Sequence, residues 1–140
     1  FRVAGGAIES HALIGRADFK ARNGDNYNGV RLEDALGVRI VNNLIKDFGG
    51  DTGDRNHSGI TTYRSTPLLI EHNEIVNCGS GIYLKAALPE GEPMKASQVR
   101  FNLFKGNRFG LNVLLQPYSK EEPLLIHQNV IVGSKEAGLW

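Results

Sequence analysis

The sequence predicts an all-β solenoid, in which short parallel strands recur once per coil around a shared core. Two interleaved sequence repeats and a high glycine content support this fold class. The chain has 140 residues, of which 41% are hydrophobic and 22% charged, a composition typical of a globular protein. Its 17 glycines against only 5 prolines indicate many tight turns between short strands.

The first repeat is an apolar residue, two further residues, an asparagine, one residue and a second apolar residue. It occurs four times at nearly even intervals, centred on Asn43, Asn73, Asn102 and Asn129. We expect these asparagines to form one column at a corner of the coil, each in the left-handed backbone turn that asparagine tolerates. Stacked amides can hydrogen-bond along such a column, so the repeat predicts an asparagine ladder.

The second repeat is a glycine followed by alternating apolar residues, which predicts a short strand. It starts at Gly29, Gly59, Gly81 and Gly110, with a further start at Gly138. We expect the apolar residues of both repeats to fill the core as aliphatic stacks. Coils that exceed the shortest spacing carry their extra residues in Gly50–Ser58, Leu88–Lys95 and Pro117–Glu122, which we expect to protrude.

Together the two repeats resemble those of right-handed parallel β-helix proteins, the pectate lyase-like superfamily, from Asn28 to Trp140. The resemblance implies a right-handed parallel β-helix of about five coils in a single domain, residues 1–140. Residues 1–28 form a degenerate first coil and residues 29–140 form regular coils that are open at both ends. We therefore expect a fragment of a longer β-helix. The rival solenoid, a leucine-rich repeat, is disfavoured because no helix-forming segment separates the strands.

In this superfamily the binding cleft usually follows the outer face of the glycine-led strand, and here both insertion sites flank that strand. Its outward positions form two predicted columns: Arg31, Thr61, Tyr83, Asn112 and Trp140, and then Glu33, Tyr63, Lys85 and Leu114. Aromatic rings stack on sugars, and cations pair with uronate carboxylates. The substrate-binding candidates are Arg31, Glu33, Tyr83, Asn112 and His57, the last because it precedes a glycine-led strand.

A narrower resemblance concerns Arg64 and Lys85, which fall on consecutive coils. Alginate lyases and chondroitinase B of the β-helix type use a lysine and an arginine about one coil apart in β-elimination. Here the order is reversed and the flanking motifs are absent. The resemblance implies Lys85 or Tyr63 as the acceptor of the sugar C5 proton, with Arg64 or Arg31 neutralising the carboxylate. The catalytic candidates are therefore Lys85, Arg64 and Tyr63.

Two functions remain open. The first is an extracellular or envelope-associated β-helix that binds or processes carbohydrate, including a polysaccharide lyase acting on acidic glycans. The alternative is a non-catalytic structural or adhesive β-helix, such as a tailspike, surface fibre or filament subunit, which forms an oligomer or larger assembly through the rest of its chain. In that case the outer face is a solvated sheet in which Glu33 pairs with Arg31 or Lys85. The location is expected from the resemblance alone.

Composition limits other partners and cofactors. A formal net charge of +1 gives no electrostatic reason to expect nucleic acid, and no apolar run is long enough to insert into a membrane. The single cysteine, Cys78, excludes a disulfide framework and is expected to be a buried filler. No cofactor or metal is predicted. Asp51, Asp54 and Asn56 could offer oxygen to Ca²⁺, but Arg55 among them argues against a dense oxygen cage.

Overall fold

The computed structural model describes residues 4–16, 26–49, 56–85, 95–114 and 120–140, and these residues form strands without a helix. The strands are β1 (Ala4–Glu9), β2 (Ala12–Ile14), β3 (Asn28–Glu33), β4 (Leu36–Val41), β5 (Leu44–Lys46), β6 (Ser58–Tyr63), β7 (Leu68–Glu71), β8 (Glu74–Val76), β9 (Ser80–Lys85), β10 (Ser97–Arg100), β11 (Leu103–Lys105), β12 (Phe109–Val113), β13 (Leu124–His127), β14 (Val130–Val132) and β15 (Ala137–Leu139).

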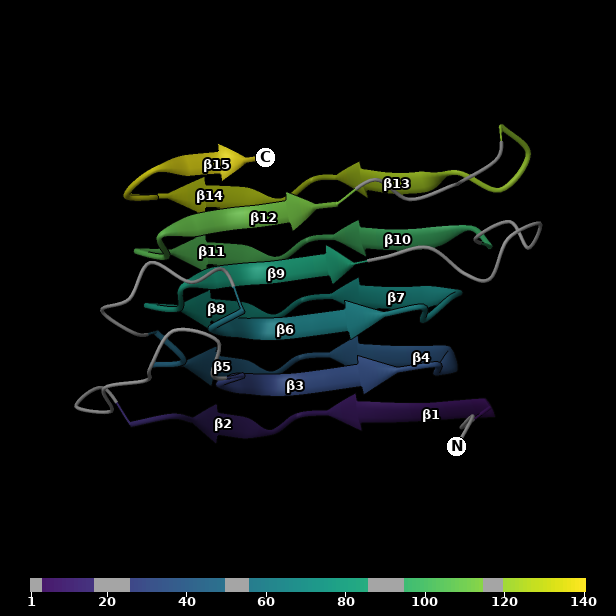
Figure 1. Ribbon diagram of the computed structural model, residues 1–140, viewed down its shortest axis with the longest axis horizontal. Coiled ribbons are helices and arrows are strands. Elements are labelled where there is room, and N and C mark those ends of the chain that lie inside the picture. The colour runs from purple at the N-terminus through teal and green to yellow at the C-terminus, as the bar shows by residue number, and fades with distance from the viewer. Residues whose placement is uncertain (1–3, 17–25, 50–55, 86–94, 115–119) are drawn as a thin grey trace.

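Within the described residues these strands make three five-stranded parallel sheets. The first sheet has the order β1-β4-β7-β10-β13, the second β2-β5-β8-β11-β14 and the third β3-β6-β9-β12-β15. Consecutive strands enter successive sheets, so every third strand returns to the same sheet one coil further along. Figure 1 shows the coils stacked from β1 and β2 at one end to β15 at the other. The predicted parallel solenoid is confirmed.

The asparagine ladder is present at the corner between the first and second sheets. The Nδ2 group of Asn43 donates to Asn73 Oδ1 at 2.9 Å, and that of Asn73 donates to Asn102 Oδ1 at 3.0 Å. Asn102 continues the column to Asn129 Oδ1 at 3.0 Å. Each of these oxygens also accepts a backbone N–H from the preceding ladder residue, as in the 3.0 Å bond from Asn73 N to Asn102 Oδ1. The ladder thus joins neighbouring coils through buried amides.

The backbone conformation expected for the ladder asparagines was wrong. The residue before each of them takes the left-handed turn, with φ between 54° and 56°: Asn42, His72, Phe101 and Gln128. This turn directs the following asparagine into the coil, where its amide reaches backbone carbonyls as well as the next ladder residue. The asparagine is therefore required for its hydrogen bonds and not for its tolerance of positive φ.

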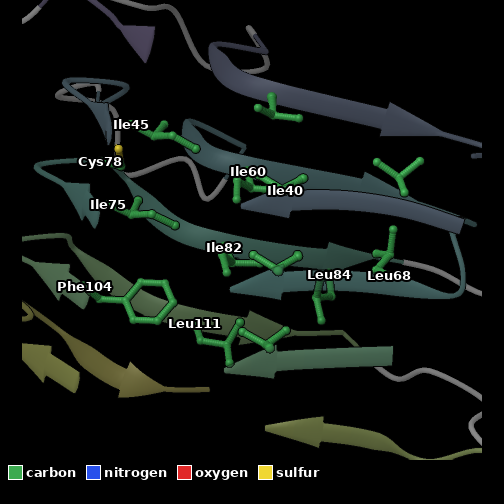
Figure 2. Packing of buried hydrophobic residues seen from close by; sticks show 14 of the residues in the cluster. Ile40, Ile45, Ile60, Leu68, Ile75, Cys78, Ile82, Leu84, Phe104 and Leu111 are labelled. Atoms are coloured by element: carbon green, nitrogen blue, oxygen red, sulfur yellow. The ribbon is translucent and has the colours of Figure 1, made fainter. Parts of the chain in front are cut away.

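The core is a set of aliphatic stacks enclosed by the three sheets (Figure 2). Ile45, Ile75 and Phe104 are in register on the second sheet and are fully buried. A second stack on the third sheet contains Val30, Ile60, Ile82 and Leu111. Cys78 packs in the same cluster, as expected of a filler, and burial raises the pKa of its thiol to about 12.

Two predicted boundaries change. Ser58 begins β6, so its assignment to a protruding insertion was wrong, and Asn28 lies in β3 opposite Ser58. Most of the three predicted insertions lies outside the described residues. Before β3, strands β1 and β2 pair with β4 and β5, so this stretch adds a strand to each of the first two sheets. The described residues contain no helix that is long and apolar enough to cross a membrane.

Candidate functional site

The outer face of the third sheet brings the predicted site residues into adjacent columns. Arg31 is opposite Thr61, Thr61 is opposite Tyr83, and Tyr83 is opposite Asn112. In the second column Glu33 is opposite Tyr63, which is opposite Lys85. These pairs have the predicted register. We call this surface, built from outward residues of β3, β6, β9 and β12, the outer face.

Sequence reasoning missed a third outward column, which contains Asn28, Ser58, Ser80 and Phe109. Strict alternation would turn Ser58 inward together with Ile60. A side chain at Gly59 would point into the core, with its Cβ 2.6 Å from Ile75 Cγ2, and Ile60 beside it is also buried. Two consecutive inward positions shift Ser58 outward, where its hydroxyl donates to Asn28 Oδ1 at 2.8 Å. A glycine at the start of each strand was the available signal for this irregularity.

Lys85 contacts polar and aromatic side chains from several parts of the outer face. Its Nζ group donates to Tyr63 Oη at 2.7 Å and to Asn56 Oδ1, and it lies 4.3 Å from the ring centre of Tyr83. The distance from Nζ to the Tyr63 ring centre is 4.8 Å, so the hydroxyl is the closer part of that tyrosine. Lys85 is only 9% exposed. Asn56 precedes β6, yet its side chain reaches the last residue of β9.

Tyr63 lies between two cations. The guanidinium carbon of Arg31 is 4.7 Å from the Tyr63 ring centre, within the range of a cation–π contact. Arg31 Nε also donates to Glu33 Oε1 at 2.7 Å, so Glu33 holds the guanidinium in place. Of the two predicted partners of Glu33, Arg31 and Lys85, this contact confirms Arg31. Arg31 and Glu33 are more exposed than Lys85, and they form the open end of the outer face.

Arg64 is tied to a carboxylate on the neighbouring coil. Its Nε and Nη2 groups donate to Asp34 Oδ1 and Oδ2 at 2.7 and 2.9 Å. The hydrogen bond and the charge of Asp34 raise the pKa of Arg64, so the guanidinium stays charged. The planar fork of Arg64 is nevertheless occupied by Asp34, and Arg31 is the arginine that contacts Tyr63.

The remaining two site candidates lie in a buried polar region. Asn112 and His57 are both 0% exposed. The Nδ2 group of Asn112 donates to Ser80 Oγ at 2.7 Å, and the backbone oxygen of His57 accepts from Ser80 N at 2.8 Å. His57 thus precedes β6, as predicted from the sequence, but its side chain is fully buried.

The described residues contain no cluster of three or more His, Cys, Asp or Glu side chains suited to a metal ion. The Ca²⁺ candidates Asp51 and Asp54 lie outside the described residues, while Asn56 is engaged by Lys85. Charge on the outer face is mostly paired, as Arg31 with Glu33 and Arg64 with Asp34. In the described part of the chain, Lys85 has no carboxylate partner and contacts neutral oxygens and aromatic rings.

Comparison with known proteins gives one family. The family described as right-handed β-helix region matches residues 7–140, which covers every coil described above. No curated protein and no solved structure matches the chain.

Proposed function

We propose that this chain, which belongs to the right-handed β-helix family, binds an acidic glycan on the outer face of its third sheet. The observation that carries the proposal is the Lys85 ammonium, which lies between Tyr63 and Tyr83 without a carboxylate partner in the described residues. The same glycan implies an extracellular or envelope location, because acidic polysaccharides occur outside the cytoplasm.

The hydrogen-bond donors of Lys85 and Tyr63 favour an anionic ligand. An ammonium group has three donors, and two of those of Lys85 are used by Tyr63 and Asn56. The Tyr63 oxygen accepts from Lys85, which leaves its own O–H to donate. One N–H and one O–H donor, on atoms 2.7 Å apart, match the two oxygens of a carboxylate. Lys85 is 9% exposed, and the low dielectric around it strengthens attraction to an anion.

The aromatic rings and the coil spacing favour a saccharide. Tyr83 and Tyr63 offer apolar ring surface beside the cation, and sugars present both apolar C–H faces and polar edges. Adjacent strands of a sheet are about 4.8 Å apart, close to the roughly 4–5 Å rise per sugar of an extended oligo-uronate. Lys85 on β9 and Arg31 on β3 are two strands apart in the same sheet, with β6 between them, so carboxylates two sugars apart can meet the two cations.

A second candidate function, β-elimination, is favoured by the hydrogen bond between Lys85 and Tyr63. In this reaction the base removes the proton at sugar C5, and the electron pair forms a C4–C5 double bond. The bond from C4 to the bridging oxygen breaks, and that oxygen takes a proton. Tyr63 and Lys85 are the groups placed to exchange those protons. We choose Arg31 over Arg64 as the cation that neutralises the carboxylate, because the Arg31 guanidinium carbon lies 4.7 Å from the Tyr63 ring centre.

The test is a calorimetric titration of the chain with oligogalacturonate and oligomannuronate, and with the carboxyl-reduced form of each. Reduction replaces every carboxylate by an alcohol and leaves the other hydroxyls unchanged. We expect the acidic oligosaccharides to bind at least about tenfold more tightly, the equivalent of one charge-assisted hydrogen bond. Equal or absent binding of all four would favour the structural or adhesive alternative. Ultraviolet absorbance of an unsaturated product, lost in Tyr63→Phe, would add elimination to binding.

A further inference from the structure

We infer that Asn56 is a specificity-determining residue of the outer face, because it holds the Lys85 ammonium with an uncharged oxygen and leaves the positive charge to the ligand. This role rests on the proposed function and deepens it. Asn56 lies just before β6, and its Oδ1 accepts a hydrogen bond from Lys85 Nζ on the neighbouring coil. The presence of an amide at this position, instead of a carboxylate, makes the outer face select an acidic glycan.

The Lys85 side chain turns back along its own strand, and this brings the ammonium to Asn56. Lys85 Nζ lies 4.3 Å from the ring centre of Tyr83, two residues earlier in β9. The same nitrogen donates to Tyr63 Oη at 2.7 Å, and Tyr63 is opposite Lys85 on the adjacent strand. Asn56 and Tyr63 thus engage two of the three ammonium donors and leave the third for a ligand.

Five arginines among the described residues have a carboxylate partner, unlike Lys85. The side chains of these arginines are at least 32% exposed, whereas Lys85 as a residue is 9% exposed. Burial makes an uncompensated charge more costly, so Lys85 needs a counter-charge more than they do. An acidic ligand supplies it. The arginine pairs are Arg31–Glu33, Arg39–Glu9, Arg64–Asp34, Arg100–Glu71 and Arg108–Glu136.

A carboxylate at position 56 would oppose the binding of an anion. It would accept the same hydrogen bond from Lys85, but its negative charge would repel a ligand carboxylate at nearly the distance from which the ammonium attracts it. The amide oxygen of Asn56 accepts the bond without a net charge. Asn56 therefore fixes the position of the ammonium and preserves its attraction for an anionic sugar.

One substitution separates this role from a structural one. Aspartate has nearly the size and shape of asparagine and keeps an acceptor oxygen for Lys85. If Asn56 serves only the fold, Asn56→Asp leaves ligand binding unchanged. If Asn56 preserves the charge of Lys85, the same variant is as stable as the unsubstituted chain or more so, because it gains an ion pair, but it loses the preference for an acidic ligand.

The experiment compares Asn56→Asp and Asn56→Ala with the unsubstituted chain. Melting temperatures are measured without ligand, and each protein is titrated with oligogalacturonate and with its carboxyl-reduced form. We expect Asn56→Asp to have an unchanged or higher Tm, to bind the acidic probe at least about tenfold more weakly and to bind the reduced probe within about twofold. Asn56→Ala removes the acceptor without adding a charge, so it should keep a preference for the acidic probe.

Asn42→Asp is the matched control, because it makes the same change in net charge at an exposed residue. Asn42 lies at the corner between the first and second sheets, and its left-handed backbone, with φ of 56°, is one that aspartate also adopts. The outer face belongs to the third sheet, and about 0.15 M salt screens a charge on a different part of the surface. Asn42→Asp should therefore leave both affinities within about twofold.

The inference is overturned if Asn56→Asp keeps the preference for the acidic probe, or if its Tm falls, which would mean that the new carboxylate does not pair with Lys85. An equal loss of preference in Asn56→Ala or in Asn42→Asp also overturns it, since position alone or net charge alone would then explain the effect. The proposed function fails by a different result, equal binding of both probes by the unsubstituted chain, and the inference then falls with it.

Discussion

The side-chain amide of Asn73 donates to the side-chain oxygen of Asn102 at 3.0 Å and links two adjacent coils of the solenoid. Asn73 Oδ1 in turn accepts from both the side chain and the backbone of Asn43. Asn73→Ala removes the acceptor of these bonds and leaves buried donors unpaired. We expect a loss of about 1–3 kcal/mol in the free energy of unfolding, measured by urea denaturation.

Gln98→Ala is the control for this prediction, because Gln98 faces outward on β10 and is not part of the ladder. Its substitution should change the free energy of unfolding by less than about 0.5 kcal/mol. Similar losses in both variants would mean that the ladder contributes no more than a surface side chain.

Gly81 and Gly138 occupy the same place in the repeat but differ in the space around them. A Cβ at Gly81 would lie 2.4 Å from the Gly110 carbonyl oxygen and 2.5 Å from Phe104 Cδ1, both within the packed coil. At Gly138 the nearest atom would be 3.6 Å away, an ordinary contact. We expect Gly81→Ala to lower stability by about 1–3 kcal/mol through overpacking, and Gly138→Ala to be nearly neutral in the same chemical denaturation.

Asp34 limits what Arg64 can bind, because it neutralises the guanidinium charge and occupies its Nε–Nη2 edge. Asp34→Asn removes the negative charge and keeps a residue that tolerates the left-handed backbone at this position, where φ is 51°. We expect affinity for oligogalacturonate to rise severalfold, while the urea midpoint changes little because the ion pair is partly exposed. An unchanged affinity at low salt would place Arg64 outside the binding surface.

The repeats predicted the fold because every coil has the same local sequence pattern. Period-two apolar residues identify the strands, and the recurring asparagine aligns successive coils, so the register from Glu33 to Tyr63 to Lys85 follows from sequence alone. The sequence did not predict which residue at each ladder corner takes the left-handed backbone conformation. Asparagine favours positive φ, but at His72 and Phe101 the geometry of the corner overrides that preference.

The candidate site was only partly predictable. The two outward columns depend on alternation, which holds from Thr61 onward but fails at Ser58, where Gly59 and Ile60 both face the core. Partner choice depends on three-dimensional contacts that a repeat does not encode. The sequence offered Glu33 two cations. It gave no reason to bring Asn56 to Lys85, or to leave the ring nitrogens of His57 without a hydrogen-bond partner among the described residues.

The central claim is that Lys85 binds a carboxylate of the ligand, and a double-mutant cycle tests it most directly. The unsubstituted chain and Lys85→Met are each titrated with oligogalacturonate and with its carboxyl-reduced form, and Lys105→Met, which removes an exposed lysine from the second sheet, is the matched control. We predict a coupling free energy of about 1.5–3 kcal/mol between Lys85 and the carboxylates, and none for Lys105. If Lys85→Met weakens both oligosaccharides by the same factor, or neither, Lys85 does not recognise the carboxylate and the account is contradicted.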